Sequence, residues 1–379
     1  MGCEGFLRSI MNRESESANL VIACGGTGGH LFPGLAVAER WVARGGQVLL
    51  LVSEKAIDRE AVKKYGQFRV ETIPALPKPA TWSPKMVTFL RRLWQTVGHC
   101  GELFAEFDAD AVLGMGGFTS LPPVFAGRRR GLATFIHDSN ALPGRANRLT
   151  ARWCDEVFLG LEAARRYFPK SPCRVTGTPV RDELRSLPDR AEAAARWGLD
   201  PARPIVLVMG GSQGARKLNQ VVAQLPQGVQ VLQLAGPREV ERVSEQVGAR
   251  AGHRVLGFCD DMAAAYAVAD AVVARSGASS LTELALLGLP SILVPYPFAA
   301  DDHQTVNARV FEQAGAAWLE PEEGLTPERL ATRLDEMLEP TMREKMAAAA
   351  RAMAVDAAAE QIVAAIGERT AERGKELGS

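Results

Sequence analysis

Three glycine-rich segments of the chain have the composition of phosphate-binding loops. They are Gly25–His30, Gly210–Ala215 and Arg275–Glu283, and each follows a short apolar run and precedes a segment with a helical pattern. Glycine lets backbone N–H groups approach a ligand closely, and the start of a helix favours a negative group. The first two loops each follow the first apolar run of one half of the chain, and together they suit a diphosphate. The alternative is that they are tight strand-to-helix turns.

Two side chains in these loops could do chemistry on such a ligand. His30 is, of the five histidines, the one beside a glycine loop. It is a candidate general base, because the ordinary pKa of an imidazole lies near neutrality. Glu283 could accept two vicinal ribose hydroxyls, with Ser279 and Ser280 near the phosphates. The alternative for Glu283 is structural, since Ser280 and Glu283 have the S-x-x-E spacing of a helix capping box.

Metal and dinucleotide sites have weaker support in the sequence. Aligning G-x-G-x-x-G on Gly26 and Gly28 puts Leu31 where the third glycine belongs, which disfavours an NAD site. The acidic clusters Asp301–His303 and Asp108–Asp110 have no second cluster with metal-ligand spacing. We therefore predict no metal and no cofactor.

Short apolar runs rich in Val, Ile and Leu must position these loops. Continuous apolar runs are typical of parallel strands buried on both faces, and helical segments between them imply crossover connections. We therefore expect an α/β fold with two doubly wound parallel sheets, one in each of two domains. The expected strands are Leu20–Cys24, Val48–Val52, Ala111–Met115, Thr134–His137, Val157–Gly160, Ile205–Met209, Val229–Leu234, Arg254–Phe258, Ala271–Ala274 and Ser291–Pro295.

The domain boundary is expected in a charged segment that is punctuated by proline and has no strand pattern, residues 181–203. This gives a disordered extension at 1–18, an N-terminal domain at 19–182 and a C-terminal domain at 183–340. The last segment, 341–379, is rich in alanine and helical in period. We expect its helices to pack back on the N-terminal domain.

Composition excludes several classes of protein. Lys+Arg and Asp+Glu are both 44, so the formal net charge is zero, which argues against a histone-like nucleic-acid binder. The six cysteines form no C-x-x-C pair, as expected for reduced thiols without a zinc cluster. The N-terminus lacks the apolar core of a secretory signal, and Gly and Pro interrupt the longest uncharged stretches, so we expect no membrane span.

Together the loops resemble the bacterial peptidoglycan N-acetylglucosaminyltransferases, which add GlcNAc from UDP-GlcNAc to lipid I to make lipid II. The resemblance extends to the C-terminal helix and rests on eight motifs in order. They are GGTGGH (25–30), GMGGF (114–118), HDSNALPGRANR (137–148), GTPVR (177–181), GGSQGA (210–215), DDMAAAY (260–266), RSGASSLTE (275–283) and DDHQTVNA (301–308).

This resemblance implies a GT-B fold, in which two Rossmann-like domains face a cleft. The C-terminal domain then holds the donor and the N-terminal domain holds the acceptor. Glu283 would take the ribose hydroxyls, and His30 and Glu283 are the two catalytic candidates. The other implied donor contacts are Thr27, Gly28 and Gly29 (sugar and diphosphate), Asn140 and Gln304 (sugar), Arg181 and Ser212 (diphosphate and uridine side), Cys259 (its backbone to uracil), and Ala278, Ser279, Ser280, Leu281 and Thr282 (diphosphate and ribose).

Two departures from the family pattern lie outside the glycine loops. The family reads HEQN where this chain has HDSN at His137–Asn140, and it reads GNPVR where this chain has Thr178. Asn140 and Arg181 are retained, so we expect an intact donor site. The changes at Asp138, Ser139 and Thr178 bear instead on how the acceptor is positioned.

The implied reaction is a single displacement at the anomeric carbon, with inversion, in which the C4 hydroxyl of lipid I attacks and UDP leaves. Because lipid I carries a polyprenyl chain, we expect a peripheral protein on the cytoplasmic face of the bacterial inner membrane. One helical face could dock there, and the alternative is that this face packs on the core. It comprises Met86, Phe89, Leu90, Leu93 and Trp94, flanked by Lys85, Arg91 and Arg92.

Two other functions remain open. One is a different UDP-sugar transferase on the same scaffold, such as a diacylglycerol galactosyltransferase, and the other is a nucleotide-sugar sensor without catalysis. The segment HDSNALPGRANR argues against the first, and the presence of both His30 and Glu283 argues against the second. The expected partners are UDP-GlcNAc, lipid I, an anionic lipid surface and the cell-wall or division machinery, and not nucleic acid.

Overall fold

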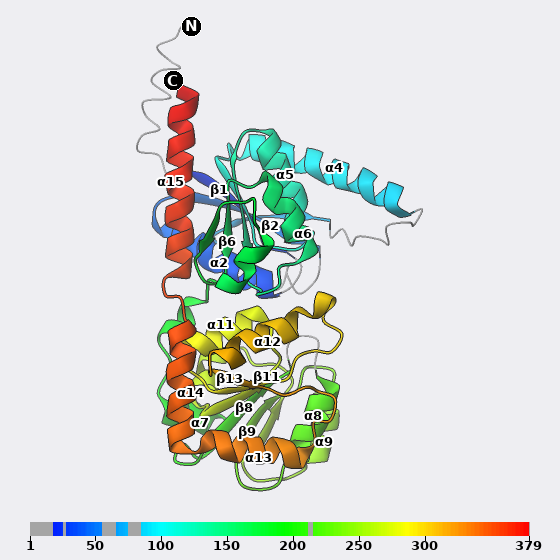
Figure 1. The fold of residues 1–379 in the computed structure, drawn as a ribbon, viewed down its shortest axis with the longest axis vertical. Coiled ribbons are helices and arrows are strands. Elements are labelled where there is room, and N and C mark those ends of the chain that lie inside the picture. Colours follow the sequence, from blue (N-terminus) through cyan, green and yellow to red (C-terminus); the bar gives the residue numbers. More distant parts are fainter. Residues whose placement is uncertain (1–17, 26–27, 55–65, 75–84, 211–214, 379) are drawn as a thin grey trace. The chain divides into compact units, whose positions relative to one another are not determined.

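The computed structural model describes residues 18–25, 28–54, 66–74, 85–210 and 215–378, and Figure 1 shows their elements. The chain forms two compact units. Unit 1 takes in the described parts of residues 1–139, 143–179 and 357–379, and unit 2 those of residues 140–142 and 180–356. The expected N-terminal extension lies outside the described residues, except for Ala18.

In the described part of unit 1, seven parallel strands form one sheet, in the order β3-β2-β1-β4-β5-β6-β7. The strand order reverses at β1, where Leu20 lies opposite Val48 on one side and Ala111 on the other. The strands are β1 (Asn19–Ala23), β2 (Gln47–Ser53), β3 (Arg69–Ile73), β4 (Ala111–Gly114), β5 (Ala133–Asp138), β6 (Glu156–Leu159) and β7 (Cys173–Val175).

Helices cover both faces of this sheet (Figure 1). They are α2 (Gly28–Ala43), α4 (Lys85–Glu106), α5 (Leu121–Arg129), α6 (Arg145–Thr150) and α15 (Ala358–Gly378). Leu20 and Ile22 of β1 belong to the core that contains α2 and α15. Val21 and Ala23 point to the other face and belong to the core that contains α4 and α5. Because successive side chains of a strand alternate between faces, a central strand with two cores must be apolar throughout.

In the described part of unit 2, six parallel strands form the second sheet, in the order β10-β9-β8-β11-β12-β13. The strands are β8 (Ile205–Met209), β9 (Gln230–Leu234), β10 (His253–Leu256), β11 (Ala271–Ala274), β12 (Ser291–Leu293) and β13 (Ala317–Leu319). The helices are α7 (Arg190–Arg196), α8 (Arg216–Ala223), α9 (Val240–Val247), α10 (Met262–Ala267), α11 (Ala278–Leu287), α12 (His303–Gln313), α13 (Pro327–Leu338) and α14 (Pro340–Met353).

The first strand of each unit occupies the place where the strand order reverses. These strands, β1 and β8, each have two parallel neighbours, and each is followed by one of the glycine loops. In open α/β sheets, ligands bind outside the carboxyl ends of the strands at this reversal point. The topology therefore puts Gly25 and Gly210, the first residues of these two loops, at the expected binding edge of their own sheets.

The two doubly wound parallel sheets expected from the sequence are confirmed, and every expected strand is present. The strands β3, β7 and β13 were not expected, and each lies at the edge of its sheet. In β3, Arg69 and Thr72 are exposed and only Ile73 is buried. An edge strand is covered on fewer sides than a central one, so it does not need the continuous apolar run from which strands were predicted.

The two C-terminal helices belong to different units, which corrects the expectation that all of 341–379 packs on the N-terminal domain. Helix α14 contacts α11 and α13, and its Met346 lies in the core of unit 2. Helix α15 instead contacts α2 and β5, and Ile362 and Ile366 are buried in the core of unit 1. The division arises because the apolar side chains of the two helices complete different cores.

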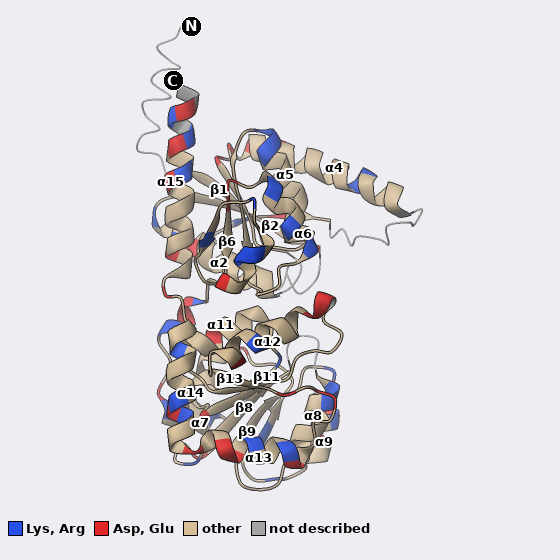
Figure 2. Ribbon diagram, in the orientation of Figure 1, with Lys and Arg blue, Asp and Glu red and all other residues tan. Residues whose placement is uncertain are grey.

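Ion pairs fasten α15 to unit 1. Arg373 Nη2 lies 2.6 Å from Asp155 Oδ1, and Arg40 Nε lies 2.9 Å from Glu360 Oε1. Figure 2 shows acidic and basic segments alternating along the outer part of α15. Arg373 also donates to the carbonyl oxygen of Leu132 at 2.9 Å, which holds the helix against the start of β5.

Candidate functional site

Glu283 lies on α11, the helix that follows the third glycine-rich loop. The helix begins at Ala278 with Gly277 as its N-cap, and no side chain caps it. Ser280 is therefore the third helical residue and cannot be the N-cap of a capping box. The Tyr266 hydroxyl donates to Glu283 Oε2 at 2.6 Å. The capping-box interpretation is wrong, and Glu283 instead accepts a hydrogen bond from α10.

Arg181 and Tyr266 share the Glu283 carboxylate. Arg181 Nη2 lies 3.7 Å from Glu283 Oε1, while Arg181 Nη1 lies 2.7 Å from Glu183 Oε1. The Glu283 side chain is 15% exposed. Burial raises the pKa of Glu283, while the hydrogen bond from Tyr266 and the charge of Arg181 act in the opposite direction. Burial and the adjacent carboxylate raise the pKa of Tyr266 well above its usual value, so this hydroxyl stays a donor.

The segment before α11 is held rigidly at the ends of β11 and β12. The Arg275 guanidinium donates to the carbonyl oxygens of Val294 and Pro295, both at 3.1 Å, and it pairs with Glu322. The Ser276 hydroxyl donates to the carbonyl oxygen of Gln304 at 2.8 Å. The first turn of α11, Ala278–Ser280, thus starts from a fixed point, and a helix start of this kind attracts anions.

Asn140 and Gln304 both belong to unit 2 and are both linked to α12. Asn307 Nδ2 donates to Asn140 Oδ1 at 3.1 Å, and the Ala141 amide donates to Asn307 Oδ1 at 2.9 Å. Gln304 Oε1 accepts the Tyr296 amide at 2.9 Å, so its NH2 group is what it can offer a ligand. Asn307 is a site residue with no predicted role, although its place one turn after Gln304 in the DDHQTVNA motif is a usable signal.

Cys259 lies in the turn between β10 and α10. Its thiol donates to the carbonyl oxygen of Asp261 at 3.2 Å, and Asp261 caps α10 through the Ala264 amide at 2.9 Å. Burial raises the pKa of Cys259, so its thiol is not activated as a nucleophile. This agrees with a structural role for the side chain and leaves the backbone as the part that the resemblance assigns to uracil.

His30 lies in the first turn of α2, against the glycine pair that follows β4. A Cβ at Gly116, whose φ is +116°, would lie 2.9 Å from His30 Cε1. Both the backbone conformation and this close approach require glycine. The Gly117 amide donates to Asn147 Oδ1 at 3.0 Å, and the Thr119 hydroxyl donates to the carbonyl oxygen of Gly25 at 2.7 Å. The GMGGF motif therefore forms one wall beside His30.

Asp138, one of the departures from the family pattern, supports that wall through Asn147. Asn147 Nδ2 donates to Asp138 Oδ2 at 2.7 Å, and the Gly144 amide donates to the same oxygen at 3.3 Å. Neighbouring His137 is fully buried, and its Nε2 donates to the carbonyl oxygen of Gly177 at 3.0 Å. Burial lowers the pKa of His137, so its imidazole is neutral and has a structural role.

The other two changed residues, Ser139 and Thr178, lie together. A Cβ on Gly160 would lie 2.4 Å from Thr178 Oγ1 and 2.8 Å from Ser139 Cα, so both residues pack on the same glycine. Thr178 is 2% exposed, and its hydroxyl has no hydrogen-bond partner among the described residues. Because both changed residues share this neighbour, they alter one place in unit 1.

Several predicted contacts lie outside the described residues. Thr27 and Ser212 are in this group, while Gly28 and Gly29 are the first residues of α2. Residues 211–214 of the second loop also lie outside the described residues, whereas α8, which follows the loop, is described. Asn219 of α8 is fully buried, and its Nδ2 donates to the carbonyl oxygen of Ala235 at 2.8 Å. This bond fixes the helix that begins at the end of the loop.

No group of three or more His, Cys, Asp or Glu side chains within the described ranges could hold a metal ion. No helix in the described part of the chain is long and apolar enough to cross a membrane.

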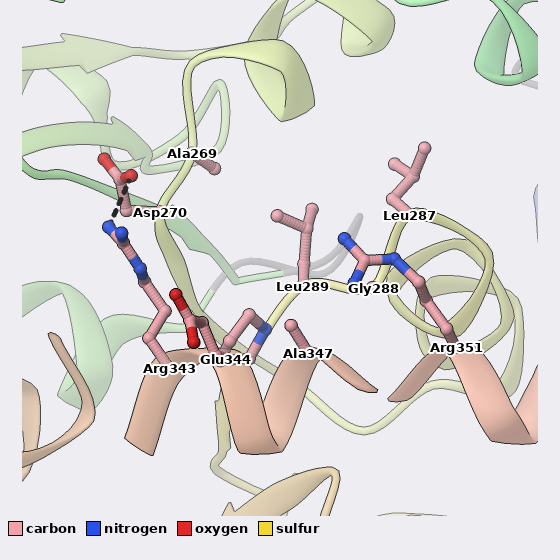
Figure 3. A pocket seen from close by; sticks show the side chains of 10 residues that line it. Ala269, Asp270, Leu287, Gly288, Leu289, Arg343, Glu344, Ala347 and Arg351 are labelled. Atoms are coloured by element: carbon pink, nitrogen blue, oxygen red, sulfur yellow. Dashed lines mark hydrogen bonds and ion pairs between the residues drawn. The ribbon is translucent and has the colours of Figure 1, made fainter. Parts of the chain in front are cut away.

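A cavity of about 340 Å³ lies beside α14, at the C-terminal end of α11, and Figure 3 shows the side chains that line it. Arg343 in this cavity pairs with Asp270 at 3.0 Å, and Asp270 also pairs with Arg190 at 2.7 Å. The lining residues include none of the predicted contacts. The cavity is thus separate from the candidate site.

The predicted docking face on α4 is partly exposed. Leu90 is 45% exposed and Trp94 is 54% exposed, so the core-facing alternative is wrong for these two. Met86, Phe89 and Leu93 are half-buried. Arg91 and Arg92 are exposed, Lys85 is the first residue of α4, and Figure 2 shows basic segments on both α4 and α5.

Comparison with known proteins gives family matches in both units. The sequence matches the glycosyltransferase family 28 N-terminal domain over residues 20–159 and the family 28 C-terminal domain over residues 205–362. It is 37% identical over 374 residues to the UDP-N-acetylglucosamine–N-acetylmuramyl-(pentapeptide) pyrophosphoryl-undecaprenol N-acetylglucosamine transferase of Geobacter sp. (strain M21). That match covers 94% of this chain and 98% of the relative.

Solved structures show the same two-domain fold. The crystal structure of Acinetobacter baumannii MurG matches with a TM-score of 0.74 and 28% identity, covering 93% of this chain and 99% of that one. The UDP-GlcNAc 2-epimerase of Neisseria meningitidis, bound to UDP-GlcNAc, matches with a TM-score of 0.66 and 12% identity, covering 91% and 98%. The second likeness concerns the fold alone. Since an epimerase and a transferase share it, the fold does not decide the reaction.

Proposed function

The chain belongs to glycosyltransferase family 28, and from this we infer that it transfers N-acetylglucosamine from UDP-GlcNAc to lipid I, giving lipid II for peptidoglycan. Its fold is the GT-B fold of the MurG structure. The single observation that carries the inference is the 37% identity to a relative whose name states donor and acceptor, over 94% of this chain. A match of that length includes both units.

We propose that unit 2 holds the donor and that Glu283 and the first turn of α11 are its main contacts. The buried carboxylate accepts the two ribose hydroxyls. The amides at the start of α11, with the Arg181 guanidinium, hold the diphosphate. Contacts within unit 2 support this assignment. Tyr266 and Arg181 both contact the Glu283 carboxylate, and Arg275 fixes the segment from which α11 starts.

The proposed reaction is one displacement at the anomeric carbon. The acceptor oxygen forms a bond to C1 of GlcNAc, the bond from C1 to the diphosphate oxygen breaks, and UDP leaves with the electron pair. His30 takes the proton of the acceptor hydroxyl. Negative charge develops on the leaving diphosphate, and preorganised donors lower such a barrier by about 3 kcal/mol each. The amides of α11 and Arg181 supply that stabilisation.

Transfer assays with matched donors test this function. The purified chain is incubated with a lipid I analogue and either radiolabelled UDP-GlcNAc or radiolabelled UDP-galactose, and the lipid fraction is counted. We expect label in the lipid only with UDP-GlcNAc. Label transferred from UDP-galactose would favour a different transferase, and nucleotide-sugar binding without transfer would favour a sensor.

We further propose that the face Met86–Trp94 docks on anionic lipid at the cytoplasmic side of the membrane. Two exposed apolar side chains, Leu90 and Trp94, lie on the same helix as the exposed Arg91 and Arg92. Arg129 of α5 lies over the Trp94 ring at 5.9 Å and adds a further cation to the face. Apolar insertion and basic residues act together on anionic membranes, with about 1 kcal/mol for each basic residue near the surface.

Liposome co-sedimentation with paired acidic substitutions tests the docking face. Leu90→Glu with Trp94→Glu is expected to lower binding to anionic vesicles about tenfold, because both apolar contacts are replaced by charges that the lipid repels. The matched control is Thr88→Glu with Gln95→Glu, which adds the same charge at exposed positions of the same helix. Equal loss in both variants would mean that net charge, and not this face, determines binding.

A further inference from the structure

A buried tyrosine, Tyr266, contacts the carboxylate that we assign to the ribose. It is 2% exposed, lies on α10, and donates its hydroxyl to Glu283 Oε2 at 2.6 Å. The two residues are 17 positions apart and on different helices. Tyr266 is not among the contacts implied by the family resemblance and takes no part in the proposed reaction. Buried hydroxyls need a hydrogen-bond partner. The partner of the Tyr266 hydroxyl is the Glu283 carboxylate and not a backbone carbonyl.

We propose that Tyr266 is a positioning residue for the donor: its hydroxyl fixes the Glu283 carboxylate in the orientation that accepts the ribose hydroxyls. The inference rests on the proposed function and deepens it, since it concerns how the nucleoside part of the donor is recognised. Tyr266 itself touches no substrate.

The contacts of Glu283 show why a second partner is needed. Arg181 lies 3.7 Å from Glu283 Oε1 but only 2.7 Å from Glu183, so its closer ion pair is with another residue. The short hydrogen bond from Tyr266 is therefore what holds the rotamer of Glu283. Each carboxylate oxygen has two lone-pair positions, so Oε1 and Oε2 can each accept a ribose hydroxyl in addition to the present contacts.

A neutral donor suits this position better than a second cation. A cation in direct contact would compete with the ribose by neutralising the carboxylate, and it would also compete with the diphosphate for Arg181. The Tyr266 hydroxyl keeps its proton at neutral pH, because burial and Glu283 raise its pKa well above the usual value. It thus orders Glu283 and leaves its negative charge available.

The hydrogen bond from Tyr266 also affects the pH at which Glu283 becomes protonated and donor binding weakens. The titratable or charged groups around Glu283 are Arg181, Glu183 and Tyr266, with Cys259 beside the tyrosine. Burial raises the pKa of Glu283, and the Tyr266 hydrogen bond lowers it. Without that hydrogen bond the pKa rises further, so Glu283 becomes protonated at a higher pH.

Tyr266→Phe tests the proposal, because the phenyl ring keeps the packing and only the hydroxyl is lost. We expect the KM for UDP-GlcNAc to rise about tenfold with kcat nearly unchanged, as for loss of one hydrogen bond to a charged group. With donors that lack the 2′ or 3′ ribose hydroxyl, the difference between the variant and the unsubstituted protein should shrink. On lowering the pH, the KM of the variant should begin to rise at a higher pH.

The control is Tyr167→Phe, which removes a tyrosine hydroxyl bonded to Arg166 in unit 1. It should leave the KM and its pH profile unchanged. In a Glu283→Gln background, Tyr266→Phe should add little further loss, and this cycle isolates the contact from any general loss of stability, which thermal unfolding also monitors.

An unaltered KM and pH profile in Tyr266→Phe, in a protein that transfers GlcNAc normally, would overturn this proposal and leave the proposed function standing. An equal KM increase for the ribose-modified donors would also overturn it, since the hydroxyl would then act elsewhere. Failure of the unsubstituted chain to transfer GlcNAc at all would overturn the proposed function, and this inference with it.

Discussion

Substitution of His30 by alanine should lower kcat by about 100- to 10,000-fold, the usual contribution of a positioned general base. The KM for UDP-GlcNAc should change little, because the main donor contacts that we propose, Glu283 and the first turn of α11, lie on unit 2, whereas His30 lies in the first turn of α2 in unit 1. The measurement is steady-state transfer to a lipid I analogue, with each substrate varied in turn.

His99→Ala is the matched control for that substitution. His99 is also a helical histidine of unit 1, but its side chain is 50% exposed on α4 and its nearest charged partner is Glu102. It should keep full turnover. If His30→Ala retained full turnover as well, the proton of the acceptor hydroxyl would have to leave by another route, and His30 would be only a contact of the GMGGF wall.

Replacing Glu283 by alanine should have the largest effect on donor binding. Two hydrogen bonds from the ribose hydroxyls to a carboxylate contribute about 1.5–3 kcal/mol each. Their loss should therefore raise the KM for UDP-GlcNAc by about 100-fold or more. The substitution also leaves the Tyr266 hydroxyl without its acceptor, which adds to the loss. Isothermal titration of UDP measures the loss of nucleotide affinity directly, without turnover.

Glu245→Gln serves as the control, since Glu245 is an exposed residue of α9 in the same unit. It should bind UDP as the unsubstituted protein does. The direction of the pH effect follows from the raised pKa of Glu283: donor binding should weaken as the pH falls toward that pKa, and Glu283→Ala should lose this dependence. Unchanged UDP affinity in Glu283→Ala would remove the carboxylate from the donor site.

The departure at Asp138 shows how a family motif can change without loss of its local contacts. Asp138 reaches Asn147, which holds Gly117 in the wall beside His30. Ser139 and Thr178 have no such part in the wall and pack on Gly160. Of the positions that differ from the family, Asp138 therefore supports the wall beside the candidate base, whereas Ser139 and Thr178 pack elsewhere in unit 1.

Much of the fold could be predicted from the sequence because the central strands obey a local rule. A strand such as β1 or β8 is buried on both faces, so all its residues are apolar and the run is visible without knowledge of its neighbours. The GMGGF motif is visible for a similar reason, because the backbone at Gly116 requires glycine. Motifs of this kind also carried the family resemblance.

The tertiary structure alone decided the features that depend on neighbours distant in sequence. The edge strands β3 and β7 have no continuous apolar run, and β13 has only three residues. The helices α14 and α15, alike in composition, separate between two cores. The apolar stripe of α4 has the same period whether it faces a core or solvent, so only its exposure shows that Leu90 and Trp94 are on the surface.

The partner of Glu283 is the clearest such case. Its spacing from Ser280 fits a capping box, yet the helix begins at Ala278 and the carboxylate accepts the Tyr266 hydroxyl from another helix. The sequence determined which residue types are present at the binding edge of each sheet. The packing of α10 on α11 determined which of them touch, because a hydrogen bond depends on positions in space that residue spacing does not encode.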